Sequence, residues 1–170
     1  MKINEKKLIK LNACDKGVEM FRRYPGLANE RAELGALCRW TASKGEAGYV
    51  HWLLPRLMEP ELAVRWAILT AKRQCADADW NKWADGWLSG EDRTEKSAEA
   101  AECTGRLAAV WAAAWAAWAA ARMEQAAMWT VEAVSGAYVS AEDKTVEIEL
   151  QISDAMEILS VDGKSGKRKG

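Results

Sequence analysis

The sequence predicts an all-α fold, a compact bundle of about six to seven helices around a long Ala/Trp helix. Residues 107–121 contain no polar side chain and are mostly Ala, the strongest helix former. Trp111, Trp115 and Trp118 recur at i, i+4 and i+7, and Trp129 falls on the same line, so all four share one helix face. Small Ala walls beside bulky Trp rings favour close helix packing, because a neighbouring ring fills the space that Ala leaves.

Three helices are predicted before residue 60. The first covers residues 5–23, although Asn12 and Asp15 form a possible capping box and the true start could be Asn12. The second runs over residues 29–43, with Asn29 as its N-cap. The third spans residues 46–58, and Pro55 within it predicts a kink or an early end.

Helical spacing continues through the middle of the chain. Pro60 suits a first helical position, so a fourth helix is expected over residues 60–76, followed by a short fifth over residues 79–88. The long Ala/Trp helix is expected over residues 94–135, ended by Gly136. Two helices broken near Thr104 and Gly105 are the alternative.

The C-terminal part is ambiguous. Apolar and polar residues alternate over residues 145–152, which indicates a short strand, but Ile148, Ile152, Ala155 and Leu159 also follow helical spacing. We choose the helix, because no second strand is evident as a partner. Residues 1–161 are therefore predicted as a single helical domain, and residues 162–170 as a flexible basic tail.

Charge and cysteine usage narrow the function classes. The net charge is −1 with both signs interspersed, which argues against nucleic acid as the partner. The four Cys residues form no CxxC pair and fall in helical patterns, so we expect buried, reduced thiols in a cytoplasm, and no metal or other cofactor. The residue 107–121 run reaches only about 22 Å as a helix, short of the roughly 30 Å membrane core, so no membrane role is expected.

The sequence offers no catalytic constellation. His51 is the single histidine, and no arrangement of nucleophile, base and orienting carboxylate surrounds it, so a structural or surface role is expected. Glu147 and Glu149 have no apolar pocket in the pattern and are interpreted as helix-surface charges. We therefore expect a protein that is not an enzyme and has no catalytic residues.

Trp80, Trp83 and Trp87 are the candidate partner-binding residues. They recur at i, i+3 and i+7 beside the polar loop at residues 89–92, so they share one helix face. Trp and Arg are enriched at interface hot spots, which adds three arginines to the candidates: Arg22, Arg23 and Arg73. The alternative is that the three Trp rings cap the bundle core.

The chain resembles a group of small Ala/Trp-rich helical immunity proteins of phages and bacteria. The resemblance rests on three segments that span most of residues 8–130: residues 11–21, with Ala-Cys-x-x-Gly leading to Phe21; Trp52-Leu-Leu-Pro-Arg-Leu57 with the helix that follows; and the Ala/Trp helix. Pro55 and residues 145–152 depart from the group's pattern. The resemblance implies an all-α fold, a phage or bacterial setting and protection by binding, and it brings no catalytic residues.

The expected function is therefore a non-enzymatic protein that blocks a partner protein, either a toxin or a host defence effector such as a CRISPR effector. One alternative is a nucleic-acid-associated helical protein that uses Arg22, Arg23, Lys72, Arg73 and the tail. Another is a structural homo-oligomer in which Ala faces pair two copies, and a homodimer is also compatible with the first reading.

Overall fold

The computed structural model describes residues 1–107, 116, 119–120, 125–141 and 143–165. Helices dominate these residues, and the all-α class is confirmed. In chain order the elements are β1 (Lys2–Asn4), α1 (Glu5–Lys10), α2 (Asp15–Arg22), β2 (Arg31–Glu33), α3 (Leu34–Ser43), α4 (Ala47–Leu53), the 3₁₀ helix η1 (Pro55–Leu57), α5 (Pro60–Lys72), α6 (Ala78–Ser89), α7 (Glu95–Leu107), α9 (Ala126–Ser140) and α10 (Lys144–Ser165). Trp111, Trp115 and Trp118 lie outside the described residues.

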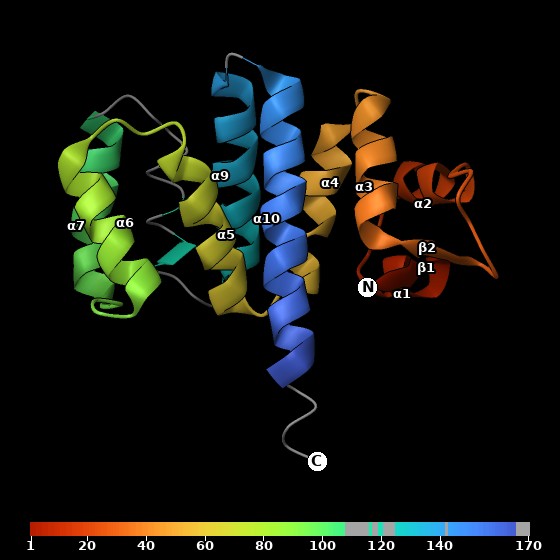
Figure 1. The fold of residues 1–170 in the computed structure, drawn as a ribbon, viewed down its shortest axis with the longest axis horizontal. Helices are drawn as coiled ribbons and strands as arrows, with labels where there is room; N and C mark the ends of the chain where they lie inside the picture. The colour runs from red at the N-terminus through yellow and green to blue at the C-terminus, as the bar shows by residue number, and fades with distance from the viewer. Residues whose placement is uncertain (108–115, 117–118, 121–124, 142, 166–170) are drawn as a thin grey trace.

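Three helices form the middle of the molecule. Figure 1 shows α5, α9 and α10 side by side, with α1 to α3 and the strands at one end and α6 and α7 at the other. Buried side chains fall into two clusters, one toward each end. The helices α5 and α9 serve both: Trp66 and Val134 belong to the first cluster, whereas Ile68 and Ala133 belong to the second.

The predicted helix over residues 5–23 is wrong as a single element. The structure has α1 and α2 instead, because the chain turns at Asn12, whose φ is 60°. Asn tolerates this left-handed backbone better than most residues. Asn4 caps α1 by accepting a hydrogen bond from the Lys7 N–H at 2.9 Å.

The predicted start of the second helix at Asn29 is also wrong. Asn29 and Glu30 have φ values of 51° and 59° and form a tight turn, closed by reciprocal backbone hydrogen bonds between Ala28 and Arg31. The turn leads into β2, which pairs antiparallel with β1 in the register Ile3 opposite Ala32. A two-stranded sheet thus occupies a segment where only helix was expected, and α3 follows it directly.

The predictions for the middle of the chain agree better with the structure. Helix α4 ends before Pro55, which opens η1, so the expected interruption is confirmed. Pro60 begins α5 as predicted, and α6 spans Ala78–Ser89, where Asp77 caps it by accepting from the Trp80 N–H at 2.8 Å.

The predicted helix over residues 94–135 is not one element. Helix α7 passes through Thr104 and Gly105 and is described as far as Leu107; residues 108–115 lie outside the description, so the alternative of a break near these positions stays untested. A separate helix, α9, begins at Ala126. Gly136 lies inside α9 and does not end it.

Residues 145–152 are helical, as chosen, and belong to α10. This helix runs on to Ser165, so residues 162–165 are helical rather than a tail, and residues 166–170 lie outside the description.

Candidate binding groove

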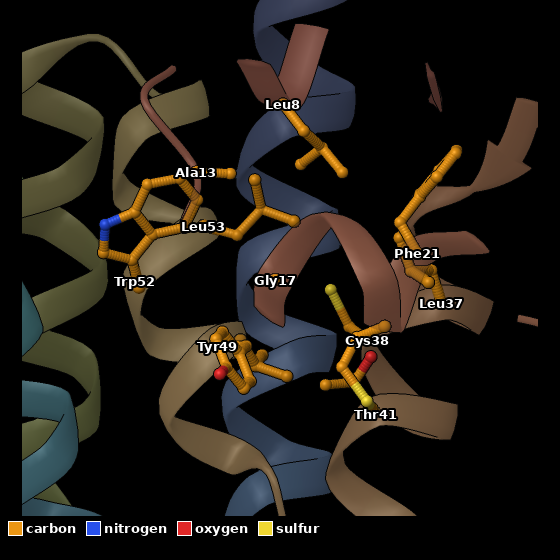
Figure 2. Close-up of a pocket in the computed structure, with 12 residues that line it drawn as sticks. Leu8, Ala13, Gly17, Phe21, Leu37, Cys38, Thr41, Tyr49, Trp52 and Leu53 are labelled. Atoms are coloured by element: carbon orange, nitrogen blue, oxygen red, sulfur yellow. The ribbon is translucent and has the colours of Figure 1, made fainter. Parts of the chain in front are cut away.

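An apolar cavity lies between α2, α3 and α4. Its volume is about 40 Å³, and it is lined by residues from these helices and α1, ten of which are labelled in Figure 2. Trp52 and Tyr49 come from α4, and Leu37 and Cys38 come from α3. Burial raises the pKa of the Cys38 thiol to about 12, so this group stays neutral and adds no charge to the cavity.

A wider surface depression of about 390 Å³ lies beside the cavity. The two spaces are adjacent and share four lining residues: Ala13, Gly17, Tyr49 and Trp52. We call the two spaces together the α2–α4 groove. Its lining at the surface is half-buried aromatic carbon on the α4 side and small residues on the α2 side.

Gly17 keeps the groove open. A Cβ placed on Gly17 would lie 3.6 Å from the Tyr49 ring and 3.7 Å from the Cys14 sulfur, which is ordinary van der Waals contact. A methyl group at position 17 would therefore touch the groove walls without a clash, and a longer side chain would extend into the space that Gly17 leaves. Glycine within a helix costs about 1 kcal/mol relative to Ala, so the residue that leaves this opening also makes the α2 helix less stable.

Two cations and one carboxylate lie at the rim of the groove. Lys16 pairs with Glu46 at 3.3 Å and lies 5.9 Å from the centre of the Tyr49 ring. Arg56 stacks on Trp52 at 4.7 Å and donates a hydrogen bond to the Trp52 carbonyl at 2.8 Å. Both cations are thus engaged within the chain, and the groove presents mainly apolar surface.

A chain of polar groups lies on the other side of α4, buried at His51 and Gln151 and half-buried at Ser135. His51, which is 2% exposed, hydrogen-bonds through Nε2 to Gln151 Oε1 at 2.8 Å and through Nδ1 to the Ser135 hydroxyl at 3.1 Å. Burial lowers the His51 pKa to about 4. The order serine, histidine, amide is that of a nucleophile, a base and an orienting group, but Ser135 lies within helix α9, whose backbone N–H groups serve the helix itself. We interpret the chain as a structural link between α4, α9 and α10.

Arg73 and Glu147 extend this link to α5. Glu147 is 4% exposed and accepts from Arg73 Nη2 at 2.8 Å and from Gln151 Nε2 at 2.9 Å, so the interpretation of Glu147 as a surface charge is wrong. Burial alone lowers the Arg73 pKa, but its hydrogen bonds to Glu147 and to Asp154 outweigh burial and raise it. Glu149, by contrast, lies in an exposed pair with Arg39 at 2.8 Å.

The sequence-predicted Trp face is a core face. Trp80 and Trp87 are 0% and 1% exposed, so they cannot contact a partner directly, and the core-capping alternative is confirmed for these two. Trp83 is half-buried, and its ring centre lies 5.6 Å from that of Trp80. Trp83 also lines a broad hollow between α6 and α7.

The three predicted arginines have partners within the chain. Arg22 pairs with Glu5 at 2.5 Å, and Arg23 pairs with Glu19 at 2.6 Å; both remain exposed. Arg73 is committed to Glu147 and Asp154. Figure 1 shows α2 and α6 at opposite ends of the molecule, so the predicted residues do not form one surface.

The groove residues were missed in the sequence because they look like ordinary core residues. Tyr49 and Trp52 at i and i+3 predict a buried helix face, and only the missing side chain at Gly17 signals an opening. Cys14 is exposed at the start of α2, against expectation, whereas Cys38 and Cys75 are buried thiols. The side chain of Cys103 lies outside the described residues.

No group of three or more His, Cys, Asp or Glu side chains in the described part of the chain is arranged to hold a metal ion. None of the helices in that part of the chain has the length and apolar character needed to cross a membrane. In comparisons with known proteins, no family model, curated protein or solved structure matches the chain.

Proposed function

We propose that this protein is a non-enzymatic binding protein that holds a partner protein through the α2–α4 groove and blocks the partner's working surface. The observation that carries the proposal is the groove itself: an apolar cavity and an adjacent surface depression, both walled by Tyr49 and Trp52. Tyr and Trp are the residues most often found at the energetic centre of protein interfaces.

The groove suits an apolar anchor side chain from the partner. Its lining offers almost no polar surface, and the nearest cations, Lys16 and Arg56, are engaged with Glu46 and Trp52. Burying one aliphatic side chain of the partner contributes about 2–3 kcal/mol. A charged rim around such an anchor favours specificity more than affinity.

The class of partner is inferred from the sequence resemblance. That resemblance suggests a toxin or a host defence effector, such as a CRISPR effector, in a bacterial cytoplasm. Inhibition by occupying a working surface needs no reactive group.

A pair of glycine substitutions tests the binding surface. Gly17→Leu places a branched side chain in the groove and also favours the α2 helix, so the variant is expected to fold. Gly86→Leu is the matched control, because Gly86 lies in helix α6, where a Cβ would meet only the Asp92 side chain at 4.0 Å, and it lines the hollow beside Trp83. We expect a partner captured from host lysate by the unchanged protein to be retained by Gly86→Leu and weakened at least tenfold by Gly17→Leu.

The opposite result assigns binding elsewhere. Retention by Gly17→Leu together with loss by Gly86→Leu would place the partner at Trp83 on α6 and reject the groove. Light scattering of the purified protein accompanies the capture, because a homodimer that is abolished by Gly17→Leu would identify a second copy as the occupant.

A further inference from the structure

We propose that the buried His51 chain is an acid-sensitive clamp: neutral His51 holds α4 against α9 and α10, and protonation of His51 releases α4. The geometry that carries this is the position of His51 between three helices. It bonds Gln151 of α10 and Ser135 of α9, and its ring meets the Tyr138 ring of α9 edge-on at 5.5 Å.

The hydrogen bonds of Gln151 fix which nitrogen of His51 carries the proton. The Gln151 amide nitrogen donates to the Val134 carbonyl at 3.0 Å and to Glu147 Oε1 at 2.9 Å. The Gln151 amide oxygen must therefore accept, and His51 Nε2 must donate to it. His51 Nδ1 is left as the acceptor of the Ser135 hydroxyl proton, which is the arrangement of a neutral imidazole.

The neighbouring charges balance a proton on Nδ1 only in part: Glu147 and Asp154 share the single cation Arg73, and the Glu147 charge raises the His51 pKa, but burial outweighs it. Glu147 is the closest carboxylate in the chain of contacts, and it is already held by Arg73 from α5 and by Gln74. Asp154 is paired with the same arginine.

The remaining titratable groups on the packed elements do not offset the charge. Lys144 lies over the Tyr138 ring and is itself positive, and Arg56 follows α4 in η1. Cys38 of α3 stays a neutral thiol, because burial raises its pKa to about 12. Protonated His51 would thus be a buried cation that keeps polar contacts but has no carboxylate in direct contact with its ring, which is unfavourable.

Helix α4 is the element that can open locally. It has seven residues, too few to be stable alone, and Glu46 at its start provides no side-chain cap. Helix α10 is much longer, and α5 is buried along most of its length. Local opening of α4 exposes His51 to water without disrupting either of them.

Release of α4 removes one wall of the α2–α4 groove, because Tyr49 and Trp52 lie on the same helix as His51. This consequence rests on the proposed function, whereas the clamp does not. The two can therefore fail separately, and the clamp is tested without any partner.

The direction of the pH effect follows from the lowered His51 pKa. Between pH 6.5 and 4 the open state binds a proton that the closed state excludes, so the closed state loses stability as the pH falls through this window. The opening equilibrium of α4 is expected to rise roughly 25-fold between pH 7 and pH 5.

Hydrogen exchange of the whole chain, corrected for intrinsic rates, measures this opening. We expect protection in residues 47–53 to fall by that factor between pH 7 and pH 5, while α6 stays unchanged. His51→Gln keeps a hydrogen-bonding side chain and should show no such fall. Equal loss of protection in α4 and α6, or the same fall in His51→Gln, would overturn the clamp.

A second readout needs no variant. His51 is the chain's single histidine, so its imidazole resonance in a proton NMR titration is unambiguous. We expect its midpoint well below 6.5 and the loss of α4 protection to follow the same curve. An ordinary midpoint with α4 still protected would reject the proposal, even if His51→Gln failed to fold.

Discussion

At the scale of single residues, burial decides what each charged side chain does. Two arginines each pair with a glutamate of α10, but in different surroundings. Arg73 reaches Glu147, which is buried, and Arg39 reaches Glu149, which is about half exposed. The same pair of residue types therefore serves the core in one place and the solvated surface in the other.

This contrast gives a matched prediction. Arg73→Met should destabilise the fold by about 3–5 kcal/mol, because it leaves the Glu147 carboxylate buried without its cation. Arg39→Met should cost under about 1 kcal/mol, because an exposed pair is screened by water. Urea unfolding of both variants at pH 7 measures the difference. Equal effects would mean that water reaches Glu147 in the folded state.

Sequence patterns predicted which residues share a face but not what covers that face. The spacing of Trp80, Trp83 and Trp87 identified one helix face, and the structure turns Trp80 and Trp87 into the core. The groove and the polar chain could not be predicted from this one sequence, since both depend on contacts between residues far apart in the chain. His51 and Gln151 are a hundred positions apart, and neither stands in a recognisable motif.

At the scale of elements, most errors have a local cause. In α10, Ile148 and Ile152 are buried as helical spacing requires, but polar Glu147 and Gln151 are buried beside them. Val146 and Leu150 are exposed instead, at 54% and 42%. A helix that buries polar residues and exposes apolar ones imitates the alternation of a strand.

The β-turn before β2 was missed in the sequence for a different reason. Its two central residues both have positive φ, which is the pattern of a type I′ turn, and Asn followed by Gly is the favoured pair there. Here Glu30 occupies the place of that glycine, so the sequence lacks the usual hairpin signal. Asn29 was interpreted as a helix cap for this reason.

Glu30→Gly should accordingly stabilise the protein. A non-glycine residue in the left-handed region costs about 1–2 kcal/mol, and the greater freedom of unfolded glycine offsets part of the gain. We expect an increase in the free energy of unfolding of about 0.5–1 kcal/mol, measured by thermal or urea unfolding. Glu33→Gly in β2 is the control and should destabilise, because β2 has ordinary extended backbone. A loss of stability in Glu30→Gly would show that the Glu30 side chain contributes more than its backbone costs.

At the scale of the whole molecule, α5 and α9 join the two buried clusters. Each helix presents different faces to them: Trp66 and Val134 to one, Ile68 and Ala133 to the other. Arg73 at the end of α5 and the His51 chain then fasten these two helices to α10 and α4. Neither end can lose its cluster without exposing a face of the shared helices.

Unfolding of the two ends should therefore be coupled. Val134→Ala removes apolar volume from the first cluster, and Ile68→Ala removes it from the second, at a cost of about 1–4 kcal/mol each. Hydrogen exchange in increasing urea should show α2 and α6 losing protection at the same concentration in each variant, with both midpoints lowered together. Suppose instead that Ile68→Ala lowered the midpoint of α6 and left α2 unchanged. Helices α5 and α9 would then stay packed against the first cluster while the second cluster opens. The two clusters would be independent folding units.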